Sequence, residues 1–145
     1  MAQVEKTVLV GHSAERMFHL VDNVKAYPSF LPWCGGVDLH RQDDVVTEAT
    51  LHIDYHGIKQ NFTTENLKTF PTDMKIQLKS GPFRHLEGFW RFTPLAEDAC
   101  KVEFTLHYEF SSTLLDRLIA PVFSHIANTF VEAFVQQADL KPLSP

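Results

Sequence analysis

Apolar and polar residues alternate over much of the chain, and this pattern predicts a sheet of antiparallel strands. Residues 2–10 carry Val4, Val8 and Val10 on one face, with the period of two expected of a half-buried strand. The connections between successive segments are short and contain turn residues, which favours a meander of antiparallel neighbours. The other predicted strands are 37–41, 45–55, 58–68, 73–79, 85–95 and 99–110.

The last two predicted strands indicate which side of the sheet faces the core. In each of them apolar and aromatic residues share one face and mostly charged residues the other, as in an antiparallel sheet that is wet on one side. Gly88 lies on the apolar face, so we expect a bend there or the close approach of another group. The apolar face comprises Leu86, Gly88, Trp90, Phe92, Val102, Phe104, Leu106, Tyr108 and Phe110.

A short helix is expected near the start of the chain, because Ser13 is a good N-cap and an apolar face follows as far as Asp22. A second short helical turn then leads into a proline-bounded segment at 27–34. Gly35 and Gly36 break the chain after that segment.

A long helix is expected at the end of the chain, capped by Ser111 or Ser112 and extending to residue 138. Pro121 should kink or restart it. The tail from Lys141 contains two prolines and is expected to fray. The predicted apolar stripe is Leu115, Leu118, Ile119, Val122, Phe123, Ile126, Ala127, Phe130, Val131 and Phe134.

These elements predict an α+β fold, in which a strongly curved antiparallel sheet of about seven strands wraps around the long C-terminal helix. The 145 residues are enough for a single domain with a real core. Twelve of the seventeen aromatic residues are Phe, which has no polar group and therefore needs a core or an apolar ligand site.

The charge is unevenly distributed along the chain. The net charge is −5, which argues against DNA as a partner. Residues 57–91 nevertheless carry six Lys or Arg against three Asp or Glu, a net charge of +3. This block is either a solvated sheet surface or a phosphate-binding face, and it contains Lys59, Lys68, Lys75, Lys79, Arg84 and Arg91.

No catalytic constellation or metal site is predicted. His52 and His56 are four residues apart on a strand, about 13 Å along the chain, which is too far to share one ion. Cys34 and Cys100 have no partner at metal-ligand spacing and are expected to be free, buried thiols. Glycine-rich phosphate loops and nucleophile-elbow motifs are absent, so we expect a protein that is not an enzyme.

The segment Tyr27-Pro-Ser-Phe-Leu-Pro-Trp-Cys34 is the most distinctive part of the sequence. It places four large apolar or aromatic side chains around two prolines, which predicts a stiff, bent, apolar loop. Such a loop covers either the rim of a core or the mouth of an apolar pocket.

This segment resembles the signature loop of a family of START-like helix-grip proteins in the polyketide cyclase/SRPBCC superfamily. The family includes the coenzyme Q-binding proteins and the bacterial ribosome association toxin RatA. The run Gly81-Pro-Phe-Arg-His-Leu-Glu-Gly-Phe-Trp-Arg-Phe92 is similar to a second family motif. The resemblance implies the helix-grip architecture and a cavity between sheet and helix that holds a lipophilic ligand.

Wall positions for this cavity follow from the resemblance and from the face assignments above. Leu51, Ile53 and Ile76 are also expected in the wall, and Tyr108 is the expected hydrogen-bond donor to a bound quinone. The predicted ligand-binding residues are Tyr27, Phe30, Leu31, Trp33, Phe62, Leu78, Trp90, Phe92, Phe104, Leu106, Tyr108, Phe123, Ile126 and Phe130.

Three functions remain open. The first hypothesis is non-catalytic binding of ubiquinone or a related polyprenyl lipid in support of respiration. The alternative is a RatA-like toxin that binds the large ribosomal subunit and blocks subunit joining, and the second alternative is a polyketide cyclase-like enzyme. Uninterrupted apolar runs near the C-terminus reach only six residues, and no signal peptide is visible. We therefore expect a bacterial cytoplasmic protein, with peripheral contact to the inner membrane if the ligand is a lipid.

Overall fold

The computed structural model describes residues 2–140, so the predicted fraying of the tail from Lys141 lies outside the described residues. It confirms the α+β helix-grip architecture. The elements are β1 (Ala2–Val10), α1 (Ala14–Asp22), the 3₁₀ turn η1 (Val24–Ala26), α2 (Tyr27–Phe30), β2 (Cys34–Gln42), β3 (Val46–Tyr55), β4 (Ile58–Thr69), β5 (Asp73–Ser80), β6 (Phe83–Ala96), β7 (Ala99–Phe110) and α3 (Thr113–Leu140).

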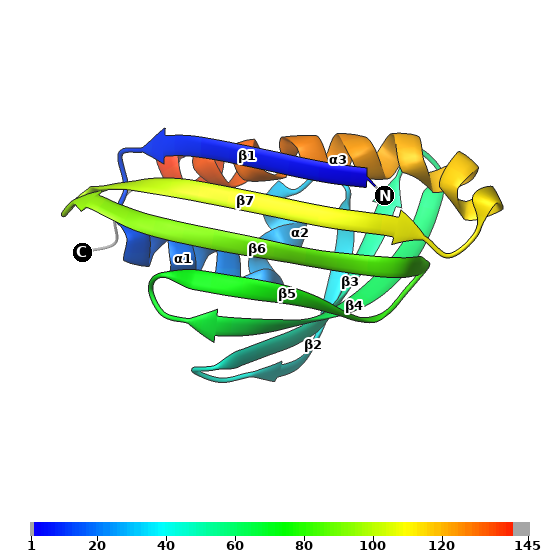
Figure 1. The fold of residues 1–145 in the computed structure, drawn as a ribbon, viewed down its shortest axis with the longest axis horizontal. Helices are drawn as coiled ribbons and strands as arrows, with labels where there is room; N and C mark the ends of the chain where they lie inside the picture. Colours follow the sequence, from blue (N-terminus) through cyan, green and yellow to red (C-terminus); the bar gives the residue numbers. More distant parts are fainter. Residues whose placement is uncertain (1, 141–145) are drawn as a thin grey trace.

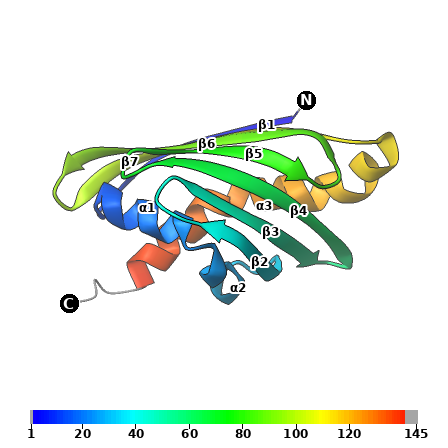
Figure 2. The ribbon, with the colours of Figure 1, turned by 90° about the horizontal axis from the view of Figure 1, so that it is seen from below.

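All seven strands belong to one antiparallel sheet with the order β1-β7-β6-β5-β4-β3-β2. Strands β2 to β7 form the predicted meander, and β1 closes the sheet beside β7, with Ala2 opposite Tyr108 and Val10 opposite Cys100. The sheet curls around α3, and α1 lies beside that helix on the same concave side (Figures 1 and 2). The apolar faces of the strands and of α3 therefore meet in one core.

Helix α3 begins as predicted, because the Ser112 hydroxyl accepts a hydrogen bond from the Leu115 amide at 3.1 Å. Pro121 lies inside the helix and does not restart it, so that part of the prediction is wrong. Leu118 is 56% exposed and does not belong to the buried stripe. The buried positions are Ile119, Phe123, Ile126, Ala127, Val131, Phe134 and Ala138.

By length and composition alone, α3 is also long and apolar enough to cross a membrane. The short uninterrupted apolar runs in the sequence did not predict this. Here its buried residues pack into the concave side of the sheet, and we therefore interpret α3 as the core helix of the fold.

The proline-bounded segment is more regular than predicted. Tyr27 adopts helical backbone angles although Pro28 follows it, and Tyr27–Phe30 form α2 instead of an irregular loop. The bias that proline imposes on the preceding residue is a preference, and here burial of Tyr27 outweighs it. Only Leu31 to Trp33 link α2 to β2.

The strand boundaries agree with the prediction to within about three residues, with the largest difference at β2. This strand begins at Cys34, so Gly35 and Gly36 lie inside the strand at a register shift and do not break the chain. Gly88 shows the expected close approach, because a Cβ there would lie 3.1 Å from Ile76 Cδ1 and 3.2 Å from Leu106 Cδ1.

Candidate functional site

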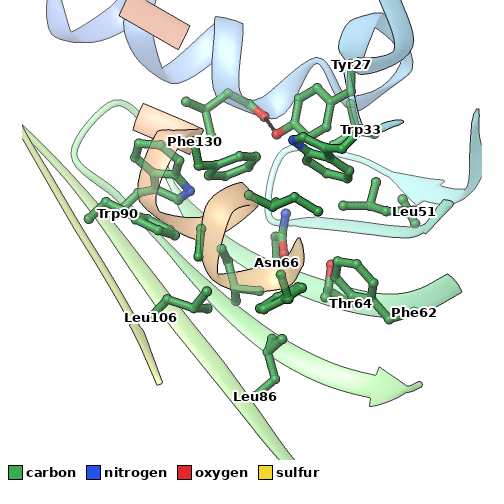
Figure 3. A pocket seen from close by; sticks show the side chains of 18 residues that line it. Tyr27, Trp33, Leu51, Phe62, Thr64, Asn66, Leu86, Trp90, Leu106 and Phe130 are labelled. Atoms are coloured by element: carbon green, nitrogen blue, oxygen red, sulfur yellow. Dashed lines mark hydrogen bonds between the residues drawn. The ribbon is translucent and has the colours of Figure 1, made fainter. Parts of the chain in front are cut away.

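An apolar cavity of about 70 Å³ lies between the concave face of the sheet and α3 (Figure 3). Its wall is contributed by α1, η1, α2 and α3 and by every strand from β3 to β7, together with Trp33. Its lining residues are buried, except for Ile76 and Phe130, which are half-buried. An engineered cavity of roughly 150 Å³ holds one benzene molecule. This cavity therefore holds less than one aromatic ring before its walls move.

Nine of the fourteen predicted ligand-binding residues line the cavity: Tyr27, Trp33, Phe62, Trp90, Phe104, Leu106, Phe123, Ile126 and Phe130. Leu51 and Ile76 also line it, as expected of wall residues, whereas Ile53 does not. The aromatic members pack edge to face and tilted, with Phe130 contacting Tyr27, Trp33, Trp90 and Phe104 at centroid distances of 5.6–6.3 Å. These rings occupy much of the space that the sequence analysis assigned to a ligand.

The other five predicted residues lie outside this lining. Phe30 packs on Phe134, and Leu31 is buried in the connection to β2. Phe92 stacks on Trp90 and also meets the ring of Phe18. Leu78 is half-buried opposite Thr64.

Tyr108 is likewise outside the cavity wall. Its ring packs on Phe83 and Phe123, and burial is the main cause that raises its pKa. The role of Tyr108 as a donor to a bound ligand therefore stays a prediction.

Sequence analysis missed the two polar residues of the cavity wall, Thr64 and Asn66. They lie on β4 at alternate positions from Phe62 and therefore share its inward face. Both are buried, and Asn66 is 8% exposed. Few apolar residues mark the inward face of β4. Because Phe62 was expected in the wall, however, the period of two along the strand would have placed Thr64 and Asn66 on the same face. Val21, Val24, Ala49, Leu86 and Ala127 complete the wall.

The Asn66 side chain has no hydrogen-bond partner for its amide oxygen among the described residues. In Figure 3 it extends from β4 into the space between the sheet, Trp33 and Phe130. Leaving a buried polar atom unpaired costs about 1–3 kcal/mol. Among the described residues, the Asn66 amide oxygen is therefore a buried polar atom of the cavity wall without a hydrogen-bond partner.

Tyr27 is the only titratable side chain in the wall formed by the described residues. Its hydroxyl donates a hydrogen bond to the Val21 carbonyl in the last turn of α1. Burial, and secondarily the negative charge of Asp22, raises the pKa of this phenol far above its usual value. Tyr27 is therefore a neutral structural donor at physiological pH.

A buried ion pair closes one side of the site. Lys68, on the same face of β4 as Asn66, lies 2.9 Å from Asp22 at the end of α1, and the Lys68 side chain is 4% exposed. Asp22 also accepts a hydrogen bond from the Thr47 hydroxyl at 2.7 Å, and its backbone carbonyl accepts one from Gln42. This cluster holds the α1 wall of the cavity against β2, β3 and β4.

The positive block is smaller on the surface than its sequence suggests. Lys68 is buried, and Lys79 and Arg84 lie 3.8 and 3.6 Å from glutamates. Lys75 and Arg91 are exposed on neighbouring strands β5 and β6, where Lys75 pairs in register with Phe89. The Arg91 guanidinium lies 5.5 Å from the Phe89 ring centroid.

The sequence matches a known family over most of its length. The family described as "Polyketide cyclase / dehydrase and lipid transport" matches residues 10–135. The chain belongs to this family. The membership in the polyketide cyclase superfamily inferred from the two sequence motifs is thereby confirmed.

Named relatives include bacterial toxins and a coenzyme Q-binding protein. The chain is 41% identical to the ribosome association toxin RatA of Vibrio cholerae over 138 residues, covering 95% of this chain and 96% of that protein. It is 28% identical to the mitochondrial coenzyme Q-binding protein COQ10 homolog B of Xenopus laevis over 141 residues, covering 94% of this chain and 57% of the relative.

Solved structures share the fold. The Zhui aromatase/cyclase from Streptomyces sp. R1128 matches 95% of this chain and 93% of its own, with a TM-score of 0.77 at 18% identity. A START superfamily protein from Mycobacterium smegmatis matches 94% of this chain and 97% of its own, with a TM-score of 0.74 at 22% identity. At these identities the similarity is one of fold alone.

Proposed function

We propose that this protein is a ribosome-association factor of the RatA type, which binds the large ribosomal subunit and hinders subunit joining. The observation that carries the proposal is 41% identity to a named RatA protein over 95% of the chain. Sequence reasoning placed this hypothesis second, behind quinone binding. The cavity volume of about 70 Å³ supports placing ribosome association first, because a prenylated quinone would have to displace part of the wall to bind.

Sucrose-gradient analysis of ribosomes from bacteria that overproduce the protein tests this proposal. We expect fewer joined ribosomes and more free subunits than in uninduced cells of the same strain, with the protein sedimenting with the large subunit. Action on the ribosome also places the protein in the bacterial cytoplasm. An unchanged subunit distribution, with the protein remaining at the top of the gradient, would reject ribosome association.

A second proposed function is the binding of a hydrophobic small molecule, with a prenylated quinone such as ubiquinone as the leading candidate. The largely apolar cavity wall and the named coenzyme Q-binding relative support it. Mass spectrometry of lipids extracted from the purified protein should then identify a prenyl lipid. Trp33 and Trp90 both line the cavity, so added ligand should change the intrinsic fluorescence. Recovery of no lipid together with unchanged fluorescence would reject it.

We also propose that such binding is not followed by catalysis. General acid–base chemistry needs a titratable group within reach of the bound molecule. The described wall offers only Tyr27, whose phenol is kept neutral and is already engaged with Val21. Incubating the purified protein with a linear aromatic-polyketide precursor should leave the precursor uncyclised beyond its spontaneous rate.

A further inference from the structure

The inward face of β4 changes from apolar to polar and then to charged along its length. Phe62, Thr64, Asn66 and Lys68 follow one another at alternate positions on that face. Phe62 packs against the rings of Phe83 and Phe123, and Lys68 is neutralised by Asp22. Thr64 and Asn66 lie between these two ends and line the cavity.

Asn66 differs from the other buried polar groups of this region. Thr47 donates a hydrogen bond to Asp22, and Lys68 pairs with the same carboxylate. The amide oxygen of Asn66 has no such partner among the described residues, although the side chain is more than nine-tenths buried. Buried polar groups in folded proteins are nearly always hydrogen-bonded. A polar atom left free by the described residues at the wall of a cavity is available to a molecule that enters the cavity.

We propose that Thr64 and Asn66 form the head-group site of the cavity and bind the hydroxyl of an amphiphilic ligand, which donates its proton to the unpaired Asn66 amide oxygen. The amide oxygen only accepts, so the ligand group that pairs with it must carry an O–H or N–H donor. The two side chains are about 6.6 Å apart along the strand, which is within the reach of one small polar head. The hydrocarbon part lies along the apolar wall that includes Leu51, Phe62, Leu86, Leu106 and Phe123.

This assignment rests on the proposed ligand-binding function and adds an orientation to it. The bound ligand lies with its polar head at Thr64 and Asn66 on β4 and its hydrocarbon part along the apolar wall. A purely hydrocarbon molecule would bury the Asn66 amide without a partner. The site should therefore discriminate between molecules that differ only in one hydrogen-bonding group.

Farnesol and its hydrocarbon counterpart farnesene are suitable probes, because they share a prenyl skeleton and differ in the hydroxyl. Titration monitored through Trp33 and Trp90 fluorescence should give farnesol a Kd about 3- to 10-fold lower, as expected for one net hydrogen bond. Asn66→Leu should remove this preference by weakening farnesol binding and sparing farnesene. Thr64→Val should reduce it in part.

Asn61→Leu is the matched control, because Asn61 lies on the same strand but is exposed and outside the cavity wall. It should keep the full preference for farnesol. The Tm reports folding separately, and we expect a higher Tm for Asn66→Leu without ligand, because an unpaired buried amide is removed.

The outcomes separate the two proposals. If the wild-type protein binds both probes equally, ligand binding stands and the head-group assignment is overturned. If it binds neither probe, the ligand-binding function fails, and the head-group assignment fails with it. A preference that survives in Asn66→Leu likewise overturns the role of Asn66.

Discussion

At the scale of single residues, Tyr27 joins local structure to the cavity. The last carbonyls of a helix lack partners within that helix, and the Tyr27 hydroxyl supplies one to Val21 at the end of α1. The same ring packs on Phe130 and Phe134 of α3. One side chain thereby fixes the position of α1 and α2 relative to the core helix.

Tyr27→Phe should show this role through its pH dependence. Burial raises the pKa of Tyr27 in the folded state above its value in the unfolded chain. Its contribution to the free energy of unfolding is therefore fully present below about pH 10 and is lost as the pH rises further. At neutral pH the variant should lose about 1 kcal/mol with the hydrogen bond.

Above pH 10 the free energy of unfolding of the wild-type protein should fall by up to about 1.4 kcal/mol per pH unit through this group. This slope should be smaller in the Tyr27→Phe variant. It should not vanish, because burial also raises the pKa of Tyr108, which the variant retains. Urea denaturation between pH 7 and 11 measures both effects. Equal alkaline slopes in the two proteins would contradict the assignment.

The two cysteines give a second prediction at this scale. Burial raises the pKa of Cys34 and Cys100, so little of either thiol is ionised near neutral pH. We expect an aromatic disulfide reagent at pH 8 to label neither thiol in the folded protein and both after denaturation in guanidinium. Rapid labelling of one thiol before unfolding would show that its environment is open.

At the scale of elements, the ion pair between Asp22 and Lys68 connects α1 to β4 beside the cavity. Removing one member of a buried pair leaves an uncompensated charge, whereas replacing both with apolar residues is often neutral. Lys68→Met should therefore destabilise the protein by about 3 kcal/mol, and Asp22→Leu in the same chain should restore most of that loss. Equilibrium urea denaturation measures both values.

Lys79→Met is the matched control for this prediction. Lys79 lies 3.8 Å from Glu65, and its side chain is 49% exposed, so its removal should cost less than about 1 kcal/mol. Equal losses for the Lys68 and Lys79 variants would show that the buried pair does not hold α1 in place.

Much of this element-level structure could be predicted from the sequence. Alternation gave six strands after the first to within about three residues, and Ser13 and Ser112 marked the helix starts. Two local signals overstated the breaks, because α3 runs through Pro121 without restarting and β2 includes Gly35 and Gly36 at a register shift. The cavity wall was harder to predict, since knowing the inward face of a strand does not tell which side chains meet empty space.

At the scale of the whole molecule, the surface charge determines whether a negatively charged particle can be a partner. The net charge of −5 opposes binding to RNA, so association must depend on a local positive surface. Lys75 is exposed on the outer side of β5, whereas the neighbouring Arg91 on β6 lies opposite Asp73 and Glu103 in register. Lys75 is therefore the candidate contact. Lys59 lies at the start of β4, opposite Asp54.

Lys75→Glu should weaken co-sedimentation with ribosomal subunits at least several-fold, and wild-type binding should decrease steeply as salt is raised. Lys59→Glu is the matched control, because it changes the net charge by the same amount at an exposed site away from Lys75. Pelleting assays between 50 and 200 mM salt provide the measurement. Equal losses for the two variants would indicate an effect of total charge and not a defined contact surface.

The pairing of the first strand with the last one has a consequence for synthesis of the protein. Ala2 on β1 faces Tyr108 on β7, so β1 emerges long before its partner exists. At translation rates of about 5–20 residues per second, the nascent chain carries β1 unpaired for roughly 5–20 seconds. The polar residues Gln3, Glu5 and Thr7 on its solvent side disfavour pairing of the unpaired β1 segment with a strand of another nascent chain.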